Sequence, residues 1–325
     1  MNNLIFKNMD RAIKIIKDND NIFIASHINP DGDNIGSILA LGLALKKVNK
    51  NVIVLKSDII PSDYEFLPGV NMIQDYTQDL GPIDVFISLD SSDEDRLGDN
   101  KLLLDNAKHI INIDHHISST MFGDINIVDS KAAATGELVY DFIKKMEIDL
   151  DIYIATNLYT AISTDTGKFS YESVTSNTHR IVAELIDTGI DFNNININLY
   201  ENMSMERTNL FINAISTLNT YENNSIATVK VTQEMLRESG AKMEDTEGIV
   251  GFIRKISSVE VACLLKELEE EDIKISLRSK KNVDVASICE YFNGGGHVRA
   301  AGCSIYSNIY EAEKIIVNKI KENIR

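Results

Sequence analysis

The sequence lacks the features that define several protein classes. Its longest apolar block, residues 38–45, is far shorter than the ~20 residues that span a membrane, and residues 1–10 contain no signal-peptide core. The three cysteines, Cys263, Cys289 and Cys303, lie among apolar or small residues without metal-ligand spacing, which argues against disulfides and a thiolate zinc site. We therefore expect a cytoplasmic protein that makes no membrane contact.

An excess of positive charge is also absent. The formal net charge of the 325 residues is −17, whereas proteins that bind the backbone of long nucleic acids usually carry basic faces. Residues 211–325 contain 15 Lys and Arg and 17 Asp and Glu, a net charge of −2, so residues 1–210 carry the remaining −15. Long duplex nucleic acid is thus disfavoured as a partner. The acidic part of the chain either is simply a soluble surface or gathers carboxylates around cations.

What the chain does have is a regular alternation of buried strands and helices, with 44% hydrophobic residues. Its length is sufficient for two packed domains. The alternation predicts an α/β first domain, a mostly parallel sheet with helices on both faces. Strands are predicted at 22–27, 52–55, 84–90 and 109–114, and helices at 10–18, from 34 to about 48, and at 134–146, 151–163 and 176–187.

A polar stretch with four asparagines, residues 191–198, indicates a domain boundary and a linker. A connecting helix at about 199–219 should lead into a smaller α+β domain. The predicted domains are 1–190 and 216–325, with the linker and connecting helix in 191–215. In the second domain we expect strands at 226–231, 259–268, 272–279 and 303–306, a helix at 246–256, and a C-terminal helix.

Several of the predicted strands and helices end on polar side chains. In a parallel sheet the carboxyl ends of all strands lie at the same edge, where open α/β sheets place their sites. We therefore expect a cluster of carboxylates and imidazoles. The residues concerned are His27, Asp31 and Asp33 after the first strand, Asp90 after the third, Asp114, His115 and His116 after the fourth, and Asp165 at the end of a helix.

Carboxylates packed together repel one another, so either their pKa values rise or cations neutralise them. Oxygen-rich ligation with two imidazoles and no thiolate suits manganese, magnesium or another divalent ion better than structural zinc. Six ligands allow one carboxylate to bridge two ions ~3.5–4 Å apart, which is the spacing of two-metal phosphoester hydrolysis. The cluster therefore predicts a two-metal site for phosphoester chemistry.

Each piece of this pattern has an ordinary explanation by itself. Residues 29–33 are turn formers, and they are not an EF-hand calcium loop because Gly42 stands where the closing glutamate would be. A lone Asp90 is by default a helix cap or a solvent-facing residue, and we interpret His109 as structural. The metal interpretation rests on the order of the clusters and on their placement at strand and helix ends.

Four motifs follow one another in the first domain: His27-Ile28-Asn29-Pro30-Asp31-Gly32-Asp33, the isolated Asp90, Asp114-His115-His116 and Thr164-Asp165-Thr166-Gly167. In this order they resemble the four motifs of the DHH phosphoesterase superfamily. Residues 294–302, Gly-Gly-Gly-His-Val-Arg-Ala-Ala-Gly, resemble the signature of the DHH-associated C-terminal domain. The resemblance spans nearly the whole chain.

The resemblance implies two manganese ions and a role for each motif residue. It implies that His116 faces the scissile phosphate and that Asp114 supports the motif from behind. The residues alone leave open whether His115 or His116 binds metal. By resemblance, one ion is held by His27, Asp31 and Asp90, and the other by Asp33, Asp90, His115 and Asp165, with Asp90 bridging.

The glycine-rich signature also has a physical interpretation. Consecutive glycines let the backbone approach a ligand closely, and their N–H groups can form an anion-binding nest. Without the resemblance, a flexible turn is the simpler interpretation. Lys168, near the metal edge, is a weaker candidate because a lone lysine is usually solvated. The expected substrate contacts of the second domain are Arg278, Gly295, Gly296, His297 and Arg299.

Within the superfamily the chain resembles the stand-alone nanoRNase and 3'-phosphoadenosine 5'-phosphate phosphatase group. The resemblance implies a manganese-dependent enzyme that hydrolyses short oligoribonucleotides to mononucleotides and dephosphorylates 3'-phosphoadenosine 5'-phosphate to AMP. One open alternative is a soluble phosphodiesterase for cyclic di-AMP or the linear dinucleotide pApA. The other is a non-catalytic nucleotide sensor, against which the presence of all six metal-ligand residues argues. A homodimer is also left open.

Overall fold

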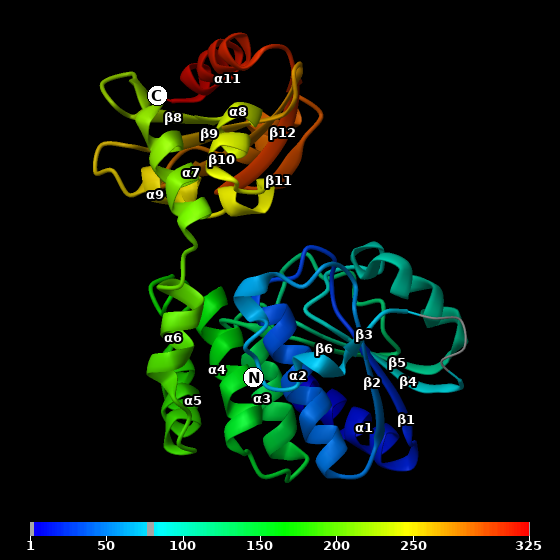
Figure 1. The fold of residues 1–325 in the computed structure, drawn as a ribbon. Helices are drawn as coiled ribbons and strands as arrows, with labels where there is room; N and C mark the ends of the chain where they lie inside the picture. Colours follow the sequence, from blue (N-terminus) through cyan, green and yellow to red (C-terminus); the bar gives the residue numbers. More distant parts are fainter. Residues whose placement is uncertain (1–2, 77–80, 325) are drawn as a thin grey trace. The chain divides into compact units, whose positions relative to one another are not determined.

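The computed structural model describes residues 3–76 and 81–324. The chain divides into two compact units, Met1–Asn202 and Met203–Arg325, each with a sheet of its own (Figure 1). No helix within the described ranges has the length and apolar character needed to cross a bilayer. Each unit has its own hydrophobic core.

The first unit contains a six-stranded sheet in which all neighbouring strands are parallel, which confirms the predicted α/β class. Two of its strands, residues 73–74 and 125–128, are absent from the sequence prediction. They are only two and four residues long, so their apolar residues form too short a pattern to recognise. In spatial order the strands are β3 (Ile73–Gln74), β2 (Asn51–Leu55), β1 (Asn21–Ala25), β4 (Ile83–Leu89), β5 (Ala107–Asp114) and β6 (Ile125–Val128).

The two faces of this sheet are covered unequally. Helices α1, α2 and α3 pack on one face, and α4 packs on α2 and α3. The other face, which includes Phe23 and Phe86, is covered by the 3₁₀ segment η3 through Leu97 and Leu103. The helices are α1 (Asn3–Asp18), α2 (Gly32–Lys47), η1 (Ser62–Tyr64), η2 (Val70–Met72), η3 (Asp95–Asn106), α3 (Thr135–Lys145), α4 (Ile152–Asp165) and α5 (Ser176–Asp187).

Residues 191–198, predicted as a linker, instead form most of helix α6 (Phe192–Tyr200). Asparagine is a weak helix former, so the composition favours a linker. Asp191 nevertheless caps the helix by accepting a hydrogen bond from the Asn194 amide (3.0 Å), and Ile195 is buried in the core of the first unit. The predicted connecting helix is interrupted as well, because α7 (Met205–Ser216) begins after a break near the division between the units.

The second unit contains a mixed six-stranded sheet with helices on both faces. Only β8 and β9 run parallel, and the other neighbouring strands are antiparallel. Helices α10 and α11 pack on one face, and α7 and α9 pack on the other. The elements are β7 (Asn219–Tyr221), β8 (Ile226–Val231), α8 (Gln233–Ser239), η4 (Met243–Thr246), α9 (Ile249–Arg254), β9 (Val261–Glu269), β10 (Asp272–Ser279), α10 (Val285–Glu290), β11 (Gly295–His297), β12 (Ala300–Tyr306) and α11 (Ile309–Asn323).

The topology of the first sheet determines where a site can form. Strand β1 lies between β2 and β4, so the chain extends the sheet on one side of β1 before it crosses to the other side. Doubly wound sheets bind ligands at the carboxyl ends of the strands beside this switch point. His27 follows β1, and Asp90 follows β4.

Candidate metal centre

The structure brings together all seven side chains that the sequence places at the metal site and its phosphate contact. Their potential ligand atoms form three sets, and within each set the atoms lie within 4.8 Å of one another. Asp90 and His115 each belong to two sets, so the sets are contiguous. The sets are His27, Asp31 and Asp90; Asp33, His115 and Asp165; and Asp90, His115 and His116.

Helix N-termini hold two of the carboxylates. Asp31 is the N-cap of α2, and its Oδ1 accepts a hydrogen bond from the Asn34 amide (3.0 Å). Asp33 lies in the first turn of α2 and accepts hydrogen bonds from the amides of Thr135 (2.6 Å) and Gly136 (2.8 Å) at the start of α3. Because helix N-termini favour negative charge, α2 and α3 stabilise the ionised carboxylates.

Close packing of α2 against α4 brings Asp165 to the same site. A Cβ atom on Gly32 would overlap the side chain of Thr164, so the first turn of α2 needs glycine at this position. Asp165 is the last residue of α4, and its Oδ2 lies 3.4 Å from His115 Nε2. The helix pair therefore supplies a carboxylate that the sheet alone does not.

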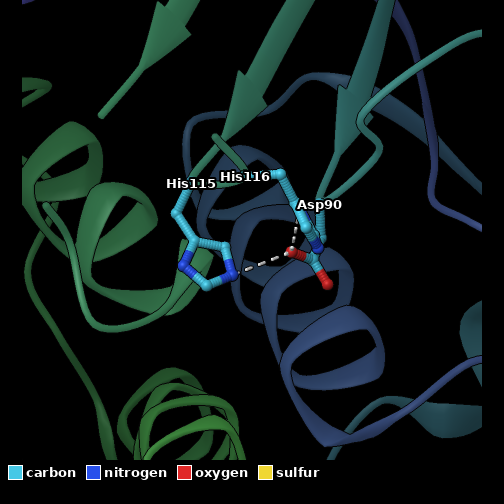
Figure 2. A group of neighbouring side chains, drawn as sticks. All are labelled: Asp90, His115 and His116. Carbon is cyan, nitrogen blue, oxygen red and sulfur yellow. Dashed lines mark ion pairs between the residues drawn. The ribbon is translucent and has the colours of Figure 1, made fainter. Parts of the chain in front are cut away.

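Asp90 occupies the centre of the cluster. Its φ of +58° is left-handed, a conformation that aspartate tolerates better than most residues. The Thr135 hydroxyl donates to its Oδ1 (2.9 Å), and His27 Nε2 lies 3.2 Å from its Oδ2. Figure 2 shows the imidazoles of His115 and His116 pointing toward this carboxylate, with His115 Nε2 and His116 Nδ1 each 3.7 Å from Oδ1. The Asp90 carboxylate thus faces His27 through Oδ2, and it faces His115 and His116 through Oδ1.

Two of the histidines share one hydrogen-bonding arrangement. His27 Nδ1 donates to the carbonyl oxygen of Ile28 (2.8 Å), and His115 Nδ1 donates to that of Ala132 (3.3 Å). A carbonyl can only accept, so each ring donates through Nδ1–H and turns Nε2 toward the carboxylates. This is the arrangement of histidine that ligates a metal.

His116 differs from its neighbour. Its Nδ1 lies 2.7 Å from Oδ1 of the buried Asp114, which also accepts the His116 amide (3.1 Å). The hydrogen bond to Asp114 outweighs burial and, with the charge of Asp90, raises the pKa of His116 to about 9. The Nδ1 atom of His116 therefore meets a carboxylate where that of His115 meets a backbone carbonyl, and the Asp114 carboxylate favours the cationic ring.

The electrostatics of the cluster fit a divalent cation. Burial, together with the charges of Asp90 and Asp165, raises the pKa of Asp33 well above its usual value. Burial likewise raises the pKa of Asp165 to about 6. Burial also raises the pKa of Asp90, but the hydrogen bond from His27 and the nearby histidines outweigh it and hold this pKa low. Carboxylates and neutral imidazoles are the donors that manganese or magnesium requires, and a cation would offset their repulsion.

Two residues at the cluster are absent from the sequence prediction. Thr135 supports both central carboxylates, since its amide donates to Asp33 and its hydroxyl to Asp90. Arg96 is half-buried in η3, and its positive charge acts on His116. Threonine at a helix start signals only a capping preference, and the segment around Arg96 has no helical or strand periodicity. For neither residue does the sequence contain a pattern that predicts a place at the cluster.

The candidate substrate residues of the second unit lie in and near its edge strand. Residues 295–297, interpreted as a nest or a turn, form β11, which pairs antiparallel with β12. Gly296 has a φ of +144°, and a Cβ there would lie 2.5 Å from the Ala300 carbonyl oxygen, so glycine is required. Arg278 on β10 is half-buried, and the exposed Arg299 donates from Nη1 to a backbone carbonyl (2.9 Å). Their contact with substrate stays a prediction.

Known proteins resemble both units. Residues 21–162 match the DHH family, N-terminal domain, and residues 223–325 match the DHHA1 domain. A Thermus thermophilus protein named bifunctional oligoribonuclease and PAP phosphatase NrnA is 31% identical over 304 residues, which cover 93% of this chain and 90% of that protein. A Bacillus subtilis protein of the same name is 27% identical over 312 residues, covering 94% and 96%.

A solved structure is similar over nearly the whole length. The crystal structure of an exopolyphosphatase-related protein from Bacteroides fragilis is 31% identical, with a TM-score of 0.92 over 98% of this chain and 96% of that one. The extent and identity of these matches agree with the motif resemblance and with the geometry of the cluster. The chain therefore belongs to the DHH family of phosphoesterases and is a hydrolase with a DHHA1 domain as its second unit.

Proposed function

We propose that this hydrolase is a two-metal phosphoesterase that uses manganese. The observation that carries the proposal is the Asp90 carboxylate, which lies in one ligand set with His27 and in another with His115. When bound, the ions supply an activated water and offset phosphate charge. We assign the first ion to His27, Asp31 and Asp90, and the second to Asp33, Asp90, His115 and Asp165.

We assign the scissile phosphate to His116. Because its Nδ1 is engaged by Asp114, Nε2–H is the end that can donate to a phosphate oxygen. With a pKa of about 9, raised chiefly by the Asp114 hydrogen bond, the ring keeps its positive charge at neutral pH. Arg96, whose charge acts on His116, is the second cation that we place on the phosphate.

The proposed substrates are short RNAs and small nucleotides. Relatives at 27–31% identity over most of the chain are named for oligoribonuclease and PAP phosphatase activity. Residues 211–325 have a net charge of only −2, so isolated basic groups such as Arg278, His297 and Arg299 suit a substrate of a few nucleotides better than a long duplex. The proposed reactions are hydrolysis of short oligoribonucleotides to mononucleotides and dephosphorylation of 3'-phosphoadenosine 5'-phosphate to AMP.

The proposed location is the cytoplasm. All three cysteines are free and buried, which suits a reducing compartment. Fractionation of cells that express a tagged copy of the chain tests this part of the proposal, and we expect the tag in the cytoplasmic fraction.

A substrate panel tests the proposed reactions. RNAs from dinucleotide to pentanucleotide, 3'-phosphoadenosine 5'-phosphate, pApA and cyclic di-AMP are compared at equal concentration with manganese. We expect the RNAs and the mononucleotide bisphosphate to be hydrolysed fastest. Faster turnover of cyclic di-AMP or pApA would favour the dinucleotide phosphodiesterase, and tight binding without turnover of any of them would favour a nucleotide sensor.

Arg299→Ala is expected to raise the KM for an RNA trinucleotide about tenfold, the equivalent of one charge-assisted hydrogen bond. The KM for the minimal ester bis-p-nitrophenyl phosphate should rise far less, because this ester has no second nucleotide for Arg299 to hold. Arg237→Ala, which removes an exposed arginine of α8, is the matched control. Equal losses on both substrates would mean that the second unit does not hold the substrate.

Chelation of the metal is expected to affect the two units differently. We propose that the predicted domains fold independently, and each unit has its own sheet and core. Excess chelator should lower hydrogen-exchange protection around the metal cluster while β8, β9 and β10 stay protected. Simultaneous loss of protection in both units would contradict separate domains.

A further inference from the structure

Glu260, an acidic residue just before β9, makes an unusual set of contacts for a half-buried side chain. Its Oε1 accepts three successive backbone N–H groups, those of Lys281 (2.9 Å), Asn282 (2.5 Å) and Val283 (3.1 Å). Its own carbonyl oxygen accepts the Lys280 amide (2.8 Å). One residue therefore fixes the whole loop that follows β10.

This loop holds the guanidinium group of Arg299. Arg299 Nη1 donates to the carbonyl oxygen of Val283 (2.9 Å), and the Arg299 carbonyl accepts the amide of Ser279 (3.1 Å) at the end of β10. The positive charge of Arg299 also acts on Glu260. Val283 thus links the two side chains: its amide donates to the Glu260 carboxylate, and its carbonyl accepts from the Arg299 guanidinium.

The same loop leads into α10, the helix that precedes the glycine-rich signature. Asp284 is the N-cap of α10 and accepts hydrogen bonds from the amides of Ala286 (2.9 Å) and Ser287 (3.3 Å). The Val285 amide donates to the carbonyl of Val298 (2.9 Å), one residue before Arg299. The residues on either side of loop 280–283, Ser279 and Val285, are therefore hydrogen-bonded to the signature segment at Arg299 and Val298.

We propose that Glu260 is a positioning residue for substrate binding, which orients Arg299 by gathering the amides of loop 280–283 so that the Val283 carbonyl holds the guanidinium. The inference rests on the proposed function, in which Arg299 contacts the nucleotide substrate. An arginine in solution samples many rotamers, and one that is already held in place loses less entropy when it binds a phosphate. Removing Glu260 should therefore weaken substrate binding although Glu260 itself does not touch the substrate.

The test compares five variants with an RNA trinucleotide and with bis-p-nitrophenyl phosphate, in the full chain with manganese; Arg299→Ala alone is one of them. Glu260→Ala is expected to raise the KM for the trinucleotide about fivefold, with a much smaller change in kcat, because loss of pre-organisation weakens binding. Glu260→Gln keeps an acceptor oxygen and should recover most of the affinity. Glu270→Ala, an exposed glutamate between β9 and β10, is the matched control.

The double variant Glu260→Ala/Arg299→Ala decides whether Glu260 acts through Arg299. If it does, Glu260→Ala should change the KM less than about twofold when Arg299 is already absent, because the two effects are not additive. A full additional loss in the double variant would overturn the inference, as would a KM for Glu260→Ala equal to that of the unmodified chain. The Gln variant keeps the test decisive if Glu260→Ala destabilises the second unit.

Failure of the inference and failure of the proposed function give different results. If Arg299→Ala leaves the trinucleotide KM unaltered, the proposed substrate contact is wrong, and the inference falls with it. If Arg299→Ala raises that KM and Glu260→Ala does not, the substrate contact stands and only the positioning role is overturned.

Discussion

Asp90→Asn is expected to lower kcat by more than about 100-fold, because even groups that only support metal ligands typically cost 10–100-fold when removed. Asparagine has the size of aspartate and retains one carbonyl oxygen, so the hydrogen bond from Thr135 can persist. What the variant loses is the negative charge that the two ligand sets share. Turnover should therefore fall on the RNA trinucleotide and on the minimal ester alike.

The measurement combines kinetics with metal content. The variant and the unmodified chain are titrated with manganese while kcat is followed, and bound manganese per chain is determined by elemental analysis. We expect both ions to bind more weakly, since Asp90 is assigned to each. Asp99→Asn, which alters an exposed aspartate of η3, should behave like the unmodified chain. Near-normal activity of Asp90→Asn would contradict the shared-ligand assignment.

The fold of the first unit could be predicted because its central strands carry a strong signal. Strands β1 and β4 are largely apolar and buried, β5 is buried over its last four residues, and a polar residue stands at or just after the end of each strand. The misassigned segments lack such a signal. In α6 the composition favours a linker, and the helix depends on a cap and a buried isoleucine. In β11 the three residues 295–297 pair with β12. This pairing is a tertiary contact, and no local sequence pattern predicts it.

The residue pattern alone predicts that the side chains of the candidate site form a cluster, but it leaves their separate roles open. Convergence of strand ends brings His27, Asp90 and His115 together by topology alone. The separate roles that we propose for His115 and His116 rest on what their Nδ1 atoms meet, a backbone carbonyl in one case and the Asp114 carboxylate in the other. Which group each Nδ1 atom contacts depends on the three-dimensional packing. The order of the two adjacent histidines in the sequence does not predict it.

A buried ion pair holds part of the second unit together. Lys230 on β8 and Glu313 on α11 are 5% and 6% exposed, and their Nζ and Oε2 atoms lie 2.6 Å apart. Glu313 Oε1 also accepts the hydroxyl of Thr228 (2.5 Å). Removing one partner of such a pair leaves an uncompensated charge in the core, which costs far more than the pair itself contributes.

Glu313→Ala is therefore expected to lower the free energy of unfolding of the second unit by about 3–5 kcal/mol. Urea titration monitored by hydrogen exchange of β8 and α11 measures the loss. Glu322→Ala breaks the exposed pair with Lys319 and should cost less than about 1 kcal/mol. The double variant Lys230→Met/Glu313→Leu should recover much of the stability, because it removes both charges. A small effect of Glu313→Ala would show that Lys230 reaches solvent or another anion once its partner is gone.

The same ion pair predicts how the loss of stability in Glu313→Ala depends on pH. Burial raises the pKa of Glu313, but the hydrogen bonds from Lys230 and Thr228 outweigh burial, and the pKa in the folded chain lies below its usual value. A group whose folded pKa is lowered stabilises the protein above its unfolded-state pKa and loses this contribution as the pH falls through the folded-state value. The stability difference between the unmodified chain and Glu313→Ala should therefore be full at neutral pH and shrink in acid. A deficit that stayed constant into strong acid would mean that lost packing of the side chain, and not its charge, explains the destabilisation.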